Sequence, residues 1–251
     1  MKLTFLAAVA WVALGAAPAL AADLPARAYS KAPAMIAAIY DWSGFYVGLN
    51  AGGSSAHHCW TNTSFGTPTV PNVAEGCNDA TGALVGGQLG YRRQTGALVF
   101  GIEAQGDWAD FKGSHASQFV PGATNQTKVD AIGLFTGQAG YAWNNVLWYV
   151  KGGAAVASDK YKGVATITGG VFDQASDSRW GGVIGTGVEV GFGPNWSVAA
   201  EYDHMFMGSR SITFTGVPAG TPARTDAVSQ DVDLATVRVN YRWGGPVVAK
   251  Y

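Results

Sequence analysis

Apolar and polar residues alternate with period two most clearly over residues 180–206. Two arms, 180–192 and 196–206, flank a Gly-Pro-Asn link. The alternation predicts two β-strands, and the three-residue link predicts that they form a hairpin. Each arm is long enough to cross a bilayer as a tilted strand, which takes about 9–11 residues. One face of the hairpin is apolar, and the other carries Glu189, Glu201 and Asp203 among small residues.

Six further segments show the same alternation, and the connections between all eight strands alternate in length. The additional strands are predicted at 42–51, 84–91, 98–108, 130–142, 146–157 and 232–243. Short connections are expected at 92–97, 143–145 and 193–195, and long polar loops at 52–83, 109–129, 158–178 and 208–231. Short turns at one end and long loops at the other are typical of outer-membrane barrels, with both termini on the periplasmic side. Greek-key sandwiches lack this strict alternation.

The distribution of charge between the two strand faces indicates which face meets lipid. In the middle of the strands, nearly every ionisable residue falls on the polar face: Glu103, Lys151, Glu189, Glu201, Asp203 and Arg238. The apolar face offers His204, near the end of its strand. A charge facing lipid at the bilayer midplane costs about 2–4 kcal/mol, so this distribution suits a lipid-exposed surface. We therefore predict an all-β, eight-stranded antiparallel up-and-down transmembrane β-barrel. A lipocalin-like soluble barrel would need the opposite arrangement.

The first residues predict export. A basic start, an apolar run at 3–14 and small residues at 19–21 indicate a signal peptide over 1–21, cut after Ala21. The run is too short for a membrane anchor, and no later stretch has the roughly 18 apolar residues of a spanning helix. Residues 22–41 are rich in Ala and Pro and are expected to form a flexible periplasmic leader. The barrel domain is placed at 42–251.

Composition agrees with a lipid-exposed, exported protein. Charged residues make up 13% of the chain, against about 25% in soluble domains. The formal net charge of −1 gives no electrostatic reason to expect nucleic acid binding.

The lumen charges allow two interpretations, a gated ion path or a plug of paired charges. The interior of an eight-stranded barrel is just wide enough for side chains to fill. Unpaired charges there would be costly, which favours the plug.

Two other groups could carry chemistry. Cys59 and Cys77 both fall in the first expected loop, and passage through the periplasm favours a disulfide, worth about 3 kcal/mol on a chain-entropy estimate. The alternative is a metal site at His57, His58 and Cys59, but no metal or other cofactor is expected. His204 raises the alternative of a lipid-modifying enzyme, which would need a serine that the outward face does not clearly offer. The sequence lacks Gly-x-Ser-x-Gly and His-Glu-x-x-His motifs, so no enzymatic activity is expected.

Three stretches carry a family resemblance: Ala-Asp-Leu-Pro-Ala-Arg at 22–27, Trp-Ser-Gly-Phe-Tyr-Val-Gly-Leu-Asn-Ala-Gly at 42–52, and Val-Asn-Tyr-Arg-Trp-Gly-Gly-Pro-Val-Val-Ala-Lys-Tyr at 239–251. They resemble the Omp25/Omp31-type outer-membrane proteins of alphaproteobacteria, and the middle of the chain is similar to OmpA-like eight-stranded barrels of the porin-like group. The resemblance covers the whole chain. No OmpA-type peptidoglycan-binding domain is expected, since the sequence stops at Tyr251.

The resemblance implies a protein of the Gram-negative cell outer membrane with a structural or surface role and four extracellular loops. The alternative is a small porin for ions or small solutes. Implied partners are outer-membrane lipid and lipopolysaccharide, and the barrel-insertion machinery, which would read a C-terminal aromatic: Tyr241 and Trp243 end the last strand, and Tyr251 ends the chain. In some relatives the mature N-terminus is joined to peptidoglycan; here that residue would be Ala22, the alternative being an untethered leader.

Overall fold

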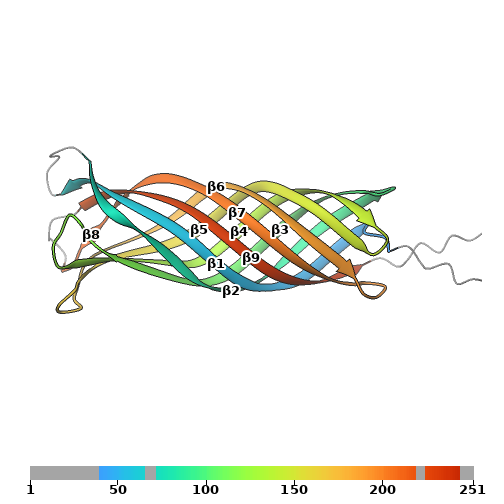
Figure 1. Cartoon of the computed structure of the whole chain (residues 1–251), viewed down its shortest axis with the longest axis horizontal. Coiled ribbons are helices and arrows are strands. Elements are labelled where there is room, and N and C mark those ends of the chain that lie inside the picture. Colours follow the sequence, from blue (N-terminus) through green and yellow to red (C-terminus); the bar gives the residue numbers. More distant parts are fainter. Residues whose placement is uncertain (1–39, 66–71, 219–223, 244–251) are drawn as a thin grey trace, which may run out of the picture. The chain divides into compact units, whose positions relative to one another are not determined.

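The computed structural model describes residues 40–65, 72–218 and 224–243. The predicted signal peptide, Ala22 and nearly all of the leader lie outside them. None of the described residues forms a helix long and apolar enough to cross a membrane. The chain forms β-strands throughout (Figure 1): β1 (Gly44–Phe65), β2 (Val73–Thr95), β3 (Leu98–Ala116), β4 (Ala123–Trp143), β5 (Val146–Ala165), β6 (Val171–Gly191), β7 (Trp196–Thr213), β8 (Thr215–Gly216) and β9 (Arg224–Trp243).

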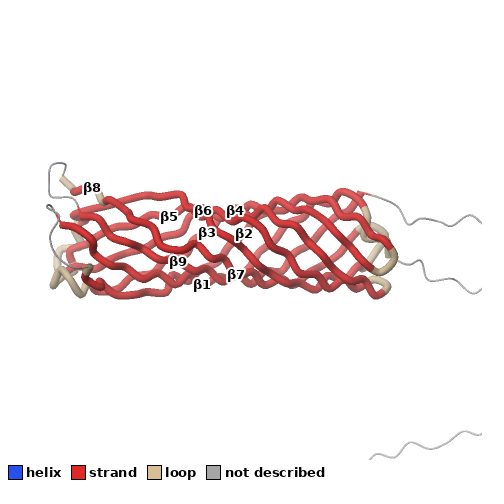
Figure 2. Tube along the Cα trace, turned by 90° about the horizontal axis from the view of Figure 1, so that it is seen from above, coloured by secondary structure: helices blue, strands red, loops and turns tan. Residues whose placement is uncertain are grey.

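The eight long strands close into a ring. Their hydrogen-bonded order is β5-β4-β3-β2-β1-β9-β7-β6, and β5 also pairs with β6. Every pair is antiparallel. The short β8 adds to the ring by pairing with β6. Figure 2 shows the long strands winding obliquely around the barrel. Closure pairs the backbone groups of all eight strands, which lipid requires. The predicted eight-stranded antiparallel barrel is confirmed.

Alternation along the strands produces an apolar outer surface. In β1, Phe45 and Leu49 are exposed, whereas Tyr46 and Asn50 are buried in the lumen. The same alternation gives the other long strands an exposed apolar face over 83–91, 98–108, 131–143, 146–156, 180–192, 196–206 and 235–243. These segments and 45–53 of β1 are called the apolar belt, and we treat them as membrane-spanning. Exposed aromatics mark its two margins, as at bilayer interfaces: Trp108 and Trp180 at one, and Tyr91, Tyr141, Trp143, Trp196 and Trp243 at the other.

The two ends of the barrel differ. Phe45 pairs with Trp243, and Gly44 pairs with Arg92, so β1 begins where β9 ends. The connections 96–97, 144–145 and 192–195 lie at this same end, here called the short-turn end. At the opposite end, the long-strand end, the strands extend beyond the apolar belt.

The prediction of four long loops was wrong over most of their length. β1 continues to Phe65 and pairs with β2 as far as Val73, although 52–83 was expected to be loop. Most of 109–129, 158–178 and 208–231 is likewise strand, and the described connections 117–122 and 166–170 are short. Outward side chains beyond the belt are mostly polar because they face water. Inward ones are partly polar too, so the contrast between faces that identifies a strand is lost.

The lumen is filled in successive layers. Trp42, Val99 and Leu147 are buried together near the short-turn end. A second apolar cluster contains Leu134, Met205 and Leu234 and lies beyond the charged residues of the belt. A third, at the long-strand end, is built around Trp60, Tyr161 and Phe214. The sequence did not predict these apolar layers, because the inward face was expected to be polar throughout.

Candidate functional site in the barrel lumen

Lys151 of β5 lies at the centre of a buried charge network. Its Nζ is 2.6 Å from Oε1 of Glu201, 3.2 Å from Oδ1 of Asp203 and 3.7 Å from Oε1 of Glu103. All four side chains are at most 1% exposed. Alternation brings them together from β3, β5 and β7, because each occupies an inward position of its strand.

Arg238 of β9 joins the same carboxylates from the other side. One guanidinium nitrogen is 2.6 Å from Oε2 of Glu103, and the other binds Glu201. Two tyrosine hydroxyls also donate hydrogen bonds to these carboxylates. Tyr46 donates to Glu103 at 2.6 Å, and Tyr149 donates to Glu201 at 2.5 Å. Five of the six predicted lumen residues therefore form one connected network.

The sixth, Glu189, belongs to a neighbouring pair with Arg92, a residue of the predicted turn at 92–97. Arg92 NH1 is 2.7 Å from Glu189 Oε2, and both side chains are buried. Ser197 and Asn240 donate to the other carboxylate oxygen. The guanidinium carbon of Arg92 also lies 4.4 Å from the centre of the Tyr46 ring, which links the pair to the main network. The alternation of β2, extended past residue 91, would have placed Arg92 in the lumen.

A further buried charge network, at the long-strand end, was not predicted from the sequence. Arg224 is within 3.4 Å of carboxylate oxygens of Glu75, Asp173 and Asp226. Its guanidinium also packs over the Phe214 ring, at 4.4 Å. Burial raises the pKa of the Asp226 carboxyl to about 7, although Arg224 opposes the rise. All five of these residues fall within expected loops, for which no inward direction could be assigned from the pattern of the chain.

Another buried ion pair lies beside it. Arg179 Nε is 3.4 Å from Asp159 Oδ2, and Tyr161 donates to the same oxygen. Burial raises the pKa of Asp159 to about 6.

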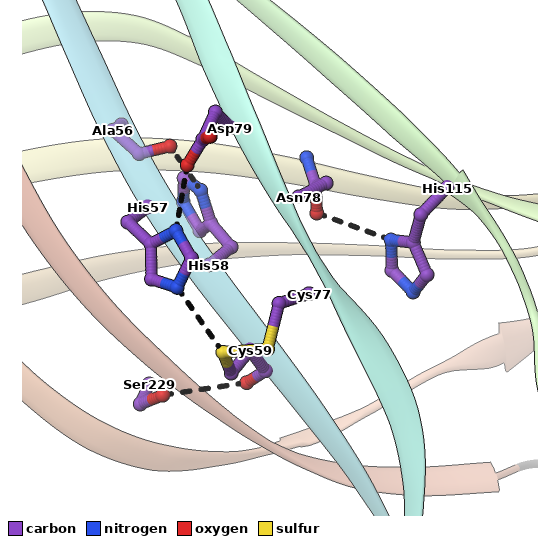
Figure 3. The surroundings of a disulfide bond; sticks show 9 residues. All are labelled: Ala56, His57, His58, Cys59, Cys77, Asn78, Asp79, His115 and Ser229. Carbon is purple, nitrogen blue, oxygen red and sulfur yellow. Dashed lines mark hydrogen bonds and ion pairs between the residues drawn. A yellow bond between two sulfur atoms is a disulfide. The ribbon is translucent and has the colours of Figure 1, made fainter.

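Cys59 and Cys77 form a disulfide between directly opposed positions of β1 and β2 (Figure 3). Beside it, His57 Nε2 is 3.4 Å from Cys59 Sγ, and His57 Nδ1 is 2.6 Å from Asp79 Oδ1. His58 points to the lumen, where burial lowers its pKa to about 4. Because His57 and His58 lie on opposite faces and both sulfurs are bonded, the three residues considered as a metal site do not converge on one ion.

His204 lies near the long-strand margin of the belt. Its Nδ1 is 2.6 Å from Asp233 Oδ1, which also accepts from the Tyr202 hydroxyl. The acid needed for the enzymatic alternative is therefore present. Among the described residues, no serine, threonine or cysteine side chain is hydrogen-bonded to His204.

Solved structures resemble the barrel at low sequence identity. The outer-membrane protease OmpT of Escherichia coli matches with a TM-score of 0.50 and 7% identity, over 80% of this chain and 97% of that one. OprG of Pseudomonas aeruginosa matches with a TM-score of 0.50 and 10% identity, over the same shares. At this identity the similarity concerns the fold, and a shared barrel does not transfer the activity of a protease.

A relative found by sequence covers nearly the whole of this chain. The 31 kDa outer-membrane immunogenic protein of Brucella melitensis is 27% identical over 255 residues, covering 97% of this chain and all of the relative. This supports the resemblance noted from the terminal motifs. Residues 7–243 match the family described as outer membrane protein beta-barrel domain. The chain therefore belongs to the outer-membrane protein β-barrel family, and the cell outer membrane is its location.

Proposed function

We propose that the protein is a closed barrel with a structural and surface role in the outer membrane. The observation that carries this is the Lys151 network, whose side chains are at most 1% exposed in the part of the lumen surrounded by the belt. Each carboxylate of this network lies close to a cation, as expected for a permanent plug and not for a hydrated path. Apolar layers with Leu147 on one side and Met205 on the other add two further barriers to water.

The surface role concerns the long-strand end. We place this end outside the cell and the short-turn end in the periplasm, as in other outer-membrane barrels. Strand extensions, rather than long loops, then carry most of the extracellular surface. The disulfide between β1 and β2 and the buried Arg224 network would keep these extensions rigid. Such a surface can be recognised by external partners while the lumen stays shut.

Single-channel recording in a planar bilayer tests the closed lumen. The refolded wild type is compared with Lys151→Ala, and Lys160→Ala serves as a matched control because Lys160 lies on the outside of β5. We expect the wild type and the control to be silent, while still migrating on gels as heat-modifiable folded barrels. Discrete wild-type openings that change in Lys151→Ala, but not in Lys160→Ala, would instead make the protein a pore with the lumen charges as its filter.

Attachment to peptidoglycan through Ala22, and recognition of a C-terminal aromatic by the insertion machinery, stay predictions. Digestion of purified cell walls followed by mass spectrometry would detect a muropeptide on Ala22. An unmodified N-terminal peptide would favour the untethered leader.

A further inference from the structure

Four of the five lysines that the structure describes lie together outside the barrel, at the long-strand end. Lys112 is on β3, Lys128 on β4, and Lys160 and Lys162 on β5. Three of them occupy a single row across the sheet, since Lys112 is directly opposite Lys128 and Lys128 is directly opposite Lys160. We call these four residues the lysine patch.

Like charges directly opposite each other destabilise a sheet, so this row needs counter-charges. Two aspartates supply part of them. Asp110 is 2.8 Å from Lys112 and 3.5 Å from Lys128, and Asp130 is 2.7 Å from Lys128 and 2.6 Å from Lys160. Both aspartates lie at β-bulges, and each is two residues from a lysine on its own strand, so the alternation of the strand puts acid and lysine on the same outer face.

The aspartates do not neutralise the patch. Four lysines against two carboxylates leave an excess of two positive charges. Among the described residues, no carboxylate lies within ion-pairing distance of Lys162. Lys112 and Lys160 are more than half exposed, so their ammonium groups can still accept an external anion. The surface is thus arranged to receive negative charge in addition to its own.

A groove of 470 Å³ runs between the lysines. Its lining combines the four lysines with the polar side chains of Ser114 and Gln126. Ser114 is opposite Gln126, and Gln126 is opposite Lys162, so a second polar row follows the lysine row. Ammonium groups suit phosphate, while hydroxyl and amide groups suit the hydroxyls of a sugar.

The height of the groove above the apolar belt indicates which kind of anion it could bind. Trp108, which is 76% exposed, marks the belt margin on β3, four residues before Lys112. At about 3.3 Å per residue and a tilt of about 40°, Lys112 lies roughly 10 Å beyond that margin. Headgroup layers extend roughly 5–8 Å beyond the hydrocarbon, which an extended lysine side chain readily spans. An anion bound here would sit at headgroup height with apolar surface directly below it.

We infer that the lysine patch binds the phosphate groups of a phosphorylated glycolipid of the outer leaflet, the lipid portion of lipopolysaccharide. The sugar would occupy the polar groove, and the acyl chains would lie against the belt around Trp108. This inference rests on the proposed orientation, in which the long-strand end faces outward. It does not depend on whether the lumen conducts.

Native mass spectrometry of the refolded protein in detergent micelles tests the site, with lipid A carrying both phosphates as the probe. The test variant is Lys112→Gln/Lys128→Gln/Lys160→Gln/Lys162→Gln. A lysine near an anionic surface contributes about fivefold in affinity, so we expect the four changes to weaken binding by at least about tenfold at low ionic strength. The difference should shrink at high salt because exposed charges are screened.

Two controls separate charge from other effects. Replacing the same four lysines by arginine keeps the charge and should preserve binding. Arg210→Gln removes an exposed cation of β7 outside the patch and should leave the affinity unchanged. Every variant is first checked for folding by heat-modifiable migration, which substitutions at these exposed positions should not disturb.

Comparing different lipids shows whether the phosphate groups are what the lysine patch recognises. Dephosphorylated lipid A should bind the wild type no better than phosphorylated lipid A binds the glutamine variant, and free inorganic phosphate should not displace the lipid. Equal binding by the wild type and the glutamine variant would overturn the inference, as would equal binding of dephosphorylated lipid A. Tighter binding of a soluble sulfated polysaccharide would reassign the patch to a polysaccharide. A silent barrel that fails to bind lipid A would refute the glycolipid site alone, whereas a conducting barrel that binds it would refute the plug alone.

Discussion

Replacing Lys151 by methionine removes one ammonium group from the lumen network while largely keeping its volume. The three neighbouring carboxylates are not affected equally. Glu103 and Glu201 retain Arg238 as a partner. Asp203 loses the cation at 3.2 Å, and no other cation is within ion-pairing distance of it among the described residues. The substitution therefore leaves one buried carboxylate without compensation.

Breaking a buried ion pair by removing one partner costs about 3–5 kcal/mol, mostly because the remaining charge is stranded. We expect Lys151→Met to lower the free energy of unfolding by an amount in this range. With a slope of about 2 kcal/mol per molar urea, the unfolding midpoint should fall by about 1.5–2.5 M.

The assay is reversible urea unfolding from phospholipid vesicles, followed by tryptophan fluorescence. Lys160→Met provides the matched control, since this lysine is exposed and its loss should barely move the midpoint. The double variant Lys151→Met/Asp203→Asn removes the stranded charge as well. It should be more stable than Lys151→Met alone, with a coupling energy of about 0.5–3 kcal/mol.

A shift below about 0.5 M for Lys151→Met, with an unchanged slope, would refute the reasoning. It would mean that water reaches Asp203 and solvates the charge, which is the condition expected in an open lumen. Strict additivity in the double variant would also contradict the assignment of Asp203 as the stranded group.

Three further predictions use the same unfolding assay. Ile102→Arg, in the middle of the belt, should cost about 2–4 kcal/mol; no change would show that this face does not meet lipid. Cys59→Ala/Cys77→Ala opens a disulfide with a sequence separation of 18 and should lower stability by up to about 3 kcal/mol, an effect that reduction of the wild type must reproduce. The pKa of Asp226, raised to about 7 from 3.8, means that the folded state holds a proton which the unfolded state releases. The stabilisation that this proton provides is therefore lost as pH rises from 3.8 to about 7. Asp226→Asn should lose less stability over the same pH range. A pH profile identical to that of the wild type would remove Asp226 as the cause.

Much of the fold followed from the sequence because lipid and lumen impose opposite requirements on neighbouring residues. Phe45, Leu49 and Ile102 had to be apolar, while Glu103, Lys151 and Arg238 could be tolerated only on the other side. Where lipid lies on one side of a strand and the polar lumen on the other, apolar and polar residues alternate with period two, and this alternation predicts the strand. Candidate lumen residues followed from the same alternation, since being inward was enough to nominate them.

Beyond the belt, outward and inward side chains no longer differ in polarity. Alternation alone therefore cannot identify a strand there. Residues 54–65 of β1 are strand because they are hydrogen-bonded to β2 and β9, not because of their own pattern. Arg92, Arg224 and Asp226 could not be assigned to the lumen until the register of their strands was known. The lysine patch has the same origin, because Lys112, Lys128 and Lys160 are 16 and 32 residues apart in sequence and become neighbours only across the ladder.

The sequence by itself determined the barrel, its eight membrane-crossing strands and the side on which each belt residue lies, because alternation is a local property set by the pleat and by lipid. The tertiary structure decided which inward charges are partners, how far the strands continue and where apolar layers interrupt the lumen. These depend on register, and register is fixed by pairing between strands distant in the chain. A local pattern shows which face a side chain occupies, but only closure of the sheet determines what lies across from it.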